Sequence, residues 1–224
     1  MKLLLTSAGI SNASIHNALV GLLGKPVSEA SALFVPTAIY GIRNGGDIVR
    51  RVICGELGDP FCNLGWKSLG LLELTALPSI KQDLWANMLL ETDALLVGGG
   101  DCQYLTYWIQ QSGLAALLPK LLRKTVYVGL SAGSMIMTSY GTTYGNHTLP
   151  PKTPKCLGLI DMAMHPHLNY PAFPENSLAN LEKLAATLPM PSYLVDDQTA
   201  IKVEDGVIEV ISEGEWKLVT PGLL

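Results

Sequence analysis

The sequence has little charge and very little arginine. Charged residues make up 15% of its 224 residues, and four of them are arginines, none of which follows Arg123. The net charge is −4 and the lysines and arginines are scattered, so the chain has no basic run of the kind that binds a nucleic acid. Hydrophobic residues make up 48%, which predicts a large core, and we expect a single domain over residues 1–224.

No segment has the length and composition of a leader or a membrane span. The first residues, MKLLLTSAG, contain one lysine and a very short apolar run. A signal peptide needs a longer apolar region before a cleavage site, and a membrane span needs about 20 apolar residues. We therefore expect a buried first strand, no membrane partner and a cytoplasmic location.

Cysteine is scarce and unpaired in the sequence. The four cysteines, Cys54, Cys62, Cys102 and Cys156, form no CxxC motif and do not cluster with histidines at the spacing of metal ligands. Reduced and mostly buried thiols are the expected state. The sequence predicts no metal site and no cofactor.

Short apolar runs alternate with helical patterns over the first 131 residues. The runs do not alternate with polar residues, which is typical of strands covered on both faces. Strand–helix alternation predicts an α/β three-layer sandwich with a mostly parallel central sheet and helices on both faces. The expected strands are 2–9, 31–38, 68–77, 93–100 and 125–131, and the expected helices are 11–24, 42–57, 79–91 and 101–124, the last broken near Gly113.

The pattern changes after about residue 139. Residues 138–155 are polar and rich in turn formers, which predicts a long loop that includes His147. Near the C-terminus, Asp205-Gly206 and Glu213-Gly214 separate alternating runs, which predicts a small β-meander.

A serine lies between two glycines in the stretch VYVGLSAGSMIM. Gly129-Leu130-Ser131-Ala132-Gly133 fits G-x-S-x-G, with a predicted strand before it and a helical pattern after it. A sharp strand-to-helix turn strains the serine and leaves no room for side chains two positions away, which glycine provides. Such a turn also aims the helix N-terminus at the site. The alternative is an ordinary turn with a capping serine.

A second glycine cluster, Gly98 to Gly100, ends another predicted strand. Its backbone can approach a ligand closely, so the N–H of Gly100 could join that of Ala132 in an oxyanion hole. A dinucleotide-binding loop is less favoured, because Gln103 stands where G-x-G-x-x-G needs its last glycine. A tight turn without a ligand is the other alternative.

A serine nucleophile needs a base, and the base needs an acid that orients it. His165 and His167 follow an apolar run in LGLIDMAMHPHLNY, and Asp196 and Asp197 follow another in SYLVDDQTAIKV. These patterns do not choose within either pair. The two histidines could also bind a metal, but no third ligand is evident, and adjacent acids are often only a turn.

These motifs together resemble one family of serine peptidases, that of peptidase E and cyanophycinase, whose fold is like that of class I glutamine amidotransferases. The resemblance covers nearly the whole chain, in the family's order and at family-like spacing. The series GGG…GxSAG…PH…(D/E)xTA is far more specific than any of its members. The matching segments are LLLTSAG, FVPTA, LLVGGGDCQYL, YVGLSAGSMIM, HPHLNY and LVDDQTAIKV.

The resemblance implies a role for each candidate. Ser131 is the nucleophile, His167 matches the family's histidine, and Asp197 stands where the closest family motifs have glutamate. Gly100 and Ala132 supply the oxyanion hole. The related amidotransferases have cysteine at the position of Ser131, which argues against glutamine hydrolysis.

The expected substrate departs from the family's. Peptidase E removes an N-terminal aspartate, and its relatives hold the substrate carboxylate with an arginine downstream of the catalytic histidine, which this chain lacks. We expect neutral groups around the substrate and a weaker preference for aspartate. These groups are Gln103, Tyr104, Asn169, Tyr170 and Gln198.

The sequence therefore predicts a serine exopeptidase for small peptides, with a Ser-His-Asp mechanism and no cofactor. It leaves open whether the chain forms a homodimer. Two alternatives remain. The first is an esterase-type serine hydrolase, although that class orders its triad serine, acid, histidine, whereas here the best acid follows the best histidine. The second is a non-catalytic binding protein that kept the turn.

Overall fold

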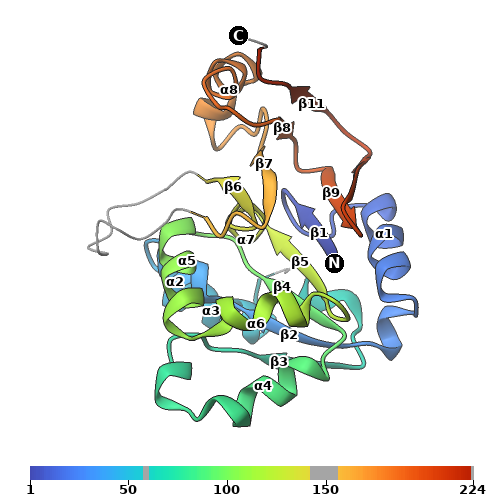
Figure 1. The fold of residues 1–224 in the computed structure, drawn as a ribbon, viewed down its shortest axis with the longest axis vertical. Helices are drawn as coiled ribbons and strands as arrows, with labels where there is room; N and C mark the ends of the chain where they lie inside the picture. Colours follow the sequence, from blue (N-terminus) through green and yellow to red (C-terminus); the bar gives the residue numbers. More distant parts are fainter. Residues whose placement is uncertain (58–60, 142–155, 223–224) are drawn as a thin grey trace.

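Two sheets form the framework of the protein in a computed structural model that describes residues 1–57, 61–141 and 156–222 (Figure 1). The larger sheet has seven strands in the order β10-β9-β1-β5-β4-β2-β3. The five from β1 to β3 in that order are parallel, and β9 and β10 are antiparallel at one edge. The strands are β1 (Lys2–Thr6), β2 (Ser31–Val35), β3 (Ser68–Leu71), β4 (Ala94–Val97), β5 (Val126–Leu130), β9 (Thr199–Glu204) and β10 (Val207–Ser212).

Successive residues of the inner strands enter two different cores. Leu3 and Leu5 of β1 belong to one apolar cluster, and Leu4 belongs to the other. The first cluster includes residues of α4 (Gln82–Leu90), α5 (Cys102–Gln111) and α6 (Leu114–Leu121); the second includes residues of α1 (Ala13–Leu23) and α3 (Gly45–Ile53). Helices on both faces explain why these strands are apolar throughout, and the predicted three-layer architecture is confirmed.

Several expected boundaries move when the chain is folded. The break at Gly113 is confirmed, because this residue has a left-handed φ of 80° between α5 and α6. The helix expected over 42–57 is shorter. A separate turn, α2 (Thr37–Tyr40), precedes it, and Gly45 lies so close to α2 that a Cβ there would come 1.9 Å from the Ile39 carbonyl oxygen. The strand expected over 68–77 ends at Leu71 and forms an exposed edge.

The second sheet lies at the upper end of the view in Figure 1 and has the order β11-β8-β7-β6. Its lower edge adjoins α7 (Ala132–Met135), and α8 (Leu178–Ala185) packs at its other end. The strands are β6 (Thr138–Tyr140), β7 (Ile160–His165), β8 (Ser192–Val195) and β11 (Trp216–Val219). Short 3-10 helices occur at Val27–Glu29, Cys62–Leu64, Leu77–Ser79 and Pro174–Asn176.

The C-terminal antiparallel strands are divided between the two sheets. Strands β9 and β10 form a hairpin whose turn residues, Asp205 and Gly206, both have positive φ. The next strand, β11, pairs instead with β8. The carboxylate of Asp196 accepts the backbone N–H of Glu215 at 2.6 Å, and a Cβ on Gly214 would come 2.1 Å from that carboxylate. This contact directs the tail away from the hairpin into the second sheet.

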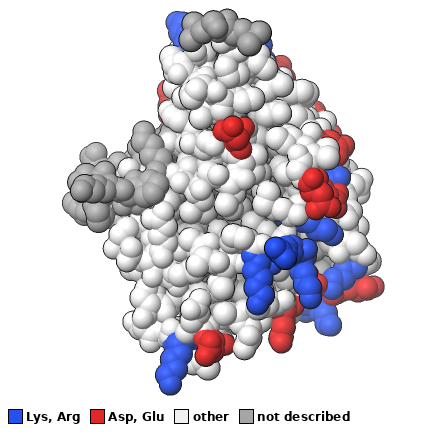
Figure 2. Space-filling model, in the orientation of Figure 1, with Lys and Arg blue, Asp and Glu red and all other residues white. Residues whose placement is uncertain are grey.

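The surface matches the low charge of the sequence. Figure 2 shows a face that is mostly neither acidic nor basic, with most of its visible lysines and arginines in the lower half. Among the described residues, no helix is both long and apolar enough to cross a membrane. The polar loop expected over 138–155 begins with β6, and its residues 142–155, which include His147, lie outside the described residues.

Candidate active site

Five segments that are far apart in the sequence meet just beyond the ends of strands. Ser7 follows β1, Gly98–Gly100 follow β4, Ser131 follows β5, His167 follows β7 and Asp197 follows β8. The carboxyl ends of parallel strands lie along one edge of a sheet, which is where open α/β sheets bind ligands. The larger sheet therefore provides the serine, and the second sheet provides the histidine and the aspartate.

Ser131 occupies the sharp turn that the sequence predicted between a strand and a helix. Its φ of 48° and ψ of −108° are strained for a residue with a side chain. The N–H of Ser131 donates to the Thr6 carbonyl at 3.0 Å, which ties the turn to the neighbouring strand. A Cβ on Gly129 would come 2.6 Å from the Ser134 nitrogen, and one on Gly133 would come 2.1 Å from the Val97 carbonyl oxygen. Both glycines are required because backbone passes where their side chains would be.

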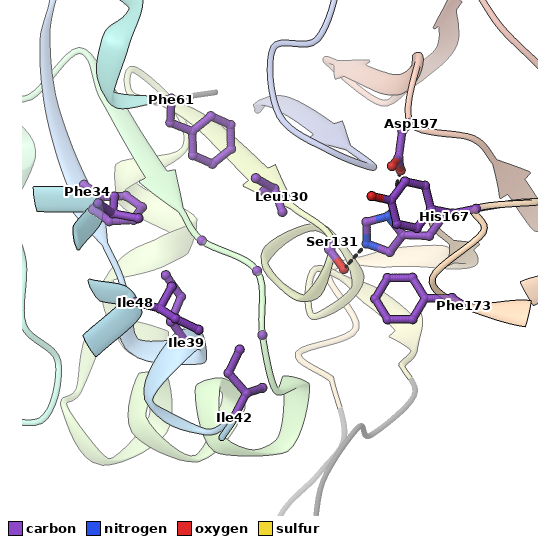
Figure 3. Close-up of a pocket in the computed structure, with 15 residues that line it drawn as sticks. Phe34, Ile39, Ile42, Ile48, Phe61, Leu130, Ser131, His167, Phe173 and Asp197 are labelled. Atoms are coloured by element: carbon purple, nitrogen blue, oxygen red, sulfur yellow. Dashed lines mark hydrogen bonds and ion pairs between the residues drawn. The ribbon is translucent and has the colours of Figure 1, made fainter. Parts of the chain in front are cut away.

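A continuous chain of hydrogen bonds joins the three predicted catalytic side chains (Figure 3). The Nε2 atom of His167 lies 3.0 Å from Oγ of Ser131, and its Nδ1 atom lies 2.7 Å from Oδ1 of Asp197. The backbone of His167 has a left-handed φ of 61°. This arrangement can move a proton from the hydroxyl to the ring while the carboxylate holds the other ring nitrogen.

Ser7 joins this network and was not predicted as a site residue. It is fully buried, its hydroxyl donates to Oδ1 of Asp197 at 2.8 Å, and it accepts the backbone N–H of His167 at 2.9 Å. Burial alone would raise the pKa of Asp197, but hydrogen bonds from His167 and Ser7 outweigh it and hold that pKa below its usual value. The available signal was weak, because Ser7 lies within the strand expected over residues 2–9, and β1 ends one residue before it.

Asp196 and His165, the other candidates for the acid and the base, have different environments from Asp197 and His167. Asp196 accepts hydrogen bonds from the Gln198 N–H, the Thr199 hydroxyl and the Glu215 N–H, so its carboxylate closes the turn between the sheets. His165 is 3% exposed and packs its ring near that of Tyr140, with centroids 5.8 Å apart. Burial lowers the pKa of His165 to about 4, so the ring is neutral.

Two backbone N–H groups near Ser131 are available as donors. Among the residues that the structure describes, neither Gly100 nor Ala132 donates its N–H to another group. Ala132 begins α7, where the first N–H groups have no partner within the helix. Gly100 has a φ of +131°, and a Cβ there would come 2.2 Å from the Ala38 carbonyl oxygen. Only glycine fits this position, next to the cavity that Ser131 also lines.

A cavity of about 560 Å³ opens beside Ser131. Of the neutral groups expected around the substrate, Tyr170 lines the cavity, whereas Gln103, Tyr104, Asn169 and Gln198 are not among its lining residues. Asn169 is directed to the second sheet, where it accepts the Leu178 N–H and donates to Glu215. The described lining residues include no lysine or arginine, and the described part of the chain has no cluster of three His, Cys, Asp or Glu that could hold a metal.

The comparisons with known proteins show the family of the chain from a profile and its fold from solved structures. The profile of peptidase family S51 matches residues 3–211. A structure from Listeria monocytogenes EGD-e, named as a candidate peptidase E protein, is 18% identical with a TM-score of 0.64, covering 95% of this chain and 98% of its own. A peptidase from an acI-B1 Actinobacterium is 17% identical with a TM-score of 0.65, covering 99% and 94%. No curated protein matches the sequence.

Proposed function

Because the chain belongs to peptidase family S51, we propose that it is a serine exopeptidase that hydrolyses small peptides. The membership agrees with the resemblance seen in the sequence motifs. The observation that carries the proposal is the hydrogen-bonded series Ser131–His167–Asp197 beside a cavity. A cavity of about 560 Å³ is within the range of small-molecule sites and suits a ligand the size of a short peptide.

In this mechanism, Ser131 attacks the carbonyl carbon of the scissile peptide bond. His167 takes the hydroxyl proton on Nε2 as the bond from Oγ forms. The negative charge that develops on the carbonyl oxygen is stabilised by the N–H groups of Gly100 and Ala132. His167 then gives its proton to the leaving amine, and the C–N bond breaks to leave an acyl-enzyme. A water molecule, activated by the same histidine, releases the acid product.

Asp197 keeps the ring of His167 in the productive orientation. Its carboxylate accepts the Nδ1–H, which leaves Nε2 free to accept the serine proton. The lowered pKa of Asp197 keeps this group ionised at neutral pH, where it also stabilises the imidazolium. Ser7 holds the carboxylate and the His167 backbone in place and is a positioning residue.

The nucleophile is tested with a fluorophosphonate probe and a dipeptide panel. Wild type should be labelled on Ser131, and Ser131→Ala should fold normally, escape labelling and lose about four orders of magnitude or more in kcat/KM. Intact-mass measurement and amine release read the two results. Ester hydrolysis without peptide hydrolysis would support an esterase, and an unreactive Ser131 would support a non-catalytic binding protein.

A further inference from the structure

The cavity has two chemically different ends (Figure 3). His167, Asp197 and Phe173 lie on one side of Ser131, and Phe34, Ile39, Ile42 and Ile48 lie on the opposite side. The described lining residues on that far side are all apolar. We call them the apolar wall, and its members are Phe34, Ile39, Ile42, Ile48, Val52 and Phe61.

The glycines after β4 keep the path from Ser131 to this wall open. A Cβ on Gly98 would come 3.4 Å from the ring of Phe34, and one on Gly99 would come 2.7 Å from the side chain of Leu130. Both glycines line the cavity, and a side chain at Gly99 would clash with Leu130. With glycine there, the space beside the reacting hydroxyl continues to the apolar wall.

The chemistry orients a substrate between the two ends. His167 must protonate the leaving amine, so the leaving group lies on the side of His167. Tyr170 and Phe173 flank this ring, with centroid distances of 6.1 and 5.1 Å. The acyl residue, whose carbonyl carbon Ser131 attacks, is left with the opposite side of the cavity.

We propose that the apolar wall receives the side chain of the acyl residue, and that this side chain is large and apolar, such as leucine, methionine or phenylalanine. The inference rests on the proposed function and names its substrate class. An aspartate side chain would bring an ionised carboxylate against apolar groups, which is costly without a paired charge.

Among the described residues, no lysine or arginine lines the cavity, so none is placed to pair with the carboxylate of a substrate aspartate. Arg50 donates to Glu56 at 2.6 Å and to Asp47 at 3.3 Å, and Arg51 lies 3.9 Å from Glu56. Arg43 is exposed and does not line the cavity. The arginines of the second predicted helix therefore do not substitute for the missing downstream arginine.

The first experiment separates binding from catalysis. Leu-Leu, Ala-Leu and Asp-Leu are titrated into Ser131→Ala by calorimetry, and wild-type kcat/KM is measured for the same peptides. Leu-Leu should bind at least about tenfold more tightly than Ala-Leu and about a hundredfold more tightly than Asp-Leu. The ranking of kcat/KM should be the same.

The second experiment compares two isoleucines of α3. Ile48 lines the cavity, whereas Ile53 is 53% exposed and does not line it. Ile48→Ala should weaken binding of Leu-Leu to the Ser131→Ala protein by about tenfold and leave Ala-Leu within about twofold. Ile53→Ala should leave the affinity for both peptides unchanged, because its side chain is outside the cavity.

The outcomes distinguish the two proposals. Equal or tighter binding of Asp-Leu, or an equal effect of the two isoleucine variants, overturns the apolar specificity whether or not peptides are hydrolysed. Preferred binding of Leu-Leu that depends on Ile48 supports it even if wild type cleaves no peptide. In that case the proposed peptidase function fails and the assignment of the apolar wall stands.

Discussion

Two histidine–aspartate pairs at the second sheet use the same residue types in different ways. His167 and Asp197 face the cavity and bond to each other, whereas His165 is buried and the partly buried Asp196 closes the turn between the sheets. His167 lies two residues after His165, and its own backbone has a left-handed φ of 61°. Residue type alone therefore does not make a site. The direction in which a strand end turns decides whether a side chain reaches the reacting group.

The largest expected difference is between the two histidines. His167→Ala removes the group that accepts the Ser131 proton and should lower kcat/KM by about four orders of magnitude. His165→Gln should lower it by less than about tenfold, because this ring is buried away from the hydroxyl. Steady-state kinetics with the best peptide of the panel measures both. Equal losses, with both variants folded by circular dichroism, would show that His167 has no special role.

The two aspartates should separate in a similar way. Asp197→Asn leaves the shape but loses the charge that stabilises the imidazolium, and kcat should fall by as much as about 10⁴-fold. Asp196→Asn should instead lower the free energy of unfolding by about 1–3 kcal/mol, because three donors lose an ionised acceptor. Kinetics and urea unfolding on both variants check this. A loss of turnover confined to Asp196→Asn would reverse the assignment.

The burial of His165 should make the free energy of unfolding depend on pH. The pKa of folded His165 is about 4, below its ordinary value of 6.5, so the unfolded chain binds this proton more readily. The contribution of the neutral ring to the free energy of unfolding is fully present above pH 6.5. It is lost as the pH falls toward 4, and the loss amounts to at most about 3 kcal/mol.

His165→Gln removes this titration and should flatten the stability profile across the same window. Urea unfolding at about pH 7 and about pH 4.5 measures the difference. His16→Gln, at a partly exposed histidine of α1, is the matched control. An unchanged slope in His165→Gln would mean that other groups cause the acid sensitivity.

The smallest expected effect belongs to Ser7 on the cavity side. Ser7→Ala removes a donor to Asp197 and an acceptor for the His167 N–H, and kcat should fall by about tenfold with KM nearly unchanged. The pKa of Asp197 should also rise, because Asp197 loses one of the hydrogen bonds that lower it, and an NMR titration of its carboxyl carbon measures this. Ser11→Ala, at an exposed serine, is the control. An unchanged pKa of Asp197 together with a lower melting temperature would indicate a structural role only.

The strand–helix order, the apolar character of the inner strands and the strained serine turn follow from local features of the sequence. Apolar runs without alternation require cover on both faces, and Gly129 and Gly133 mark close backbone contacts that only glycine permits. The family motifs also identify Ser131, His167 and Asp197 as candidates. These signals lie within short segments, which is why they can be read without the fold.

Three features depend on the tertiary structure. Ser7 enters the network only because β1 ends beside β5, at a separation of 160 residues from His167. Gln103, Tyr104 and Asn169 are near the motifs in sequence, yet they do not line the cavity, since helix and loop direction set where a side chain points. The apolar wall joins β2, α2, α3 and Phe61 across the cavity from His167. Contacts between distant segments have no local pattern, so packing alone decided them.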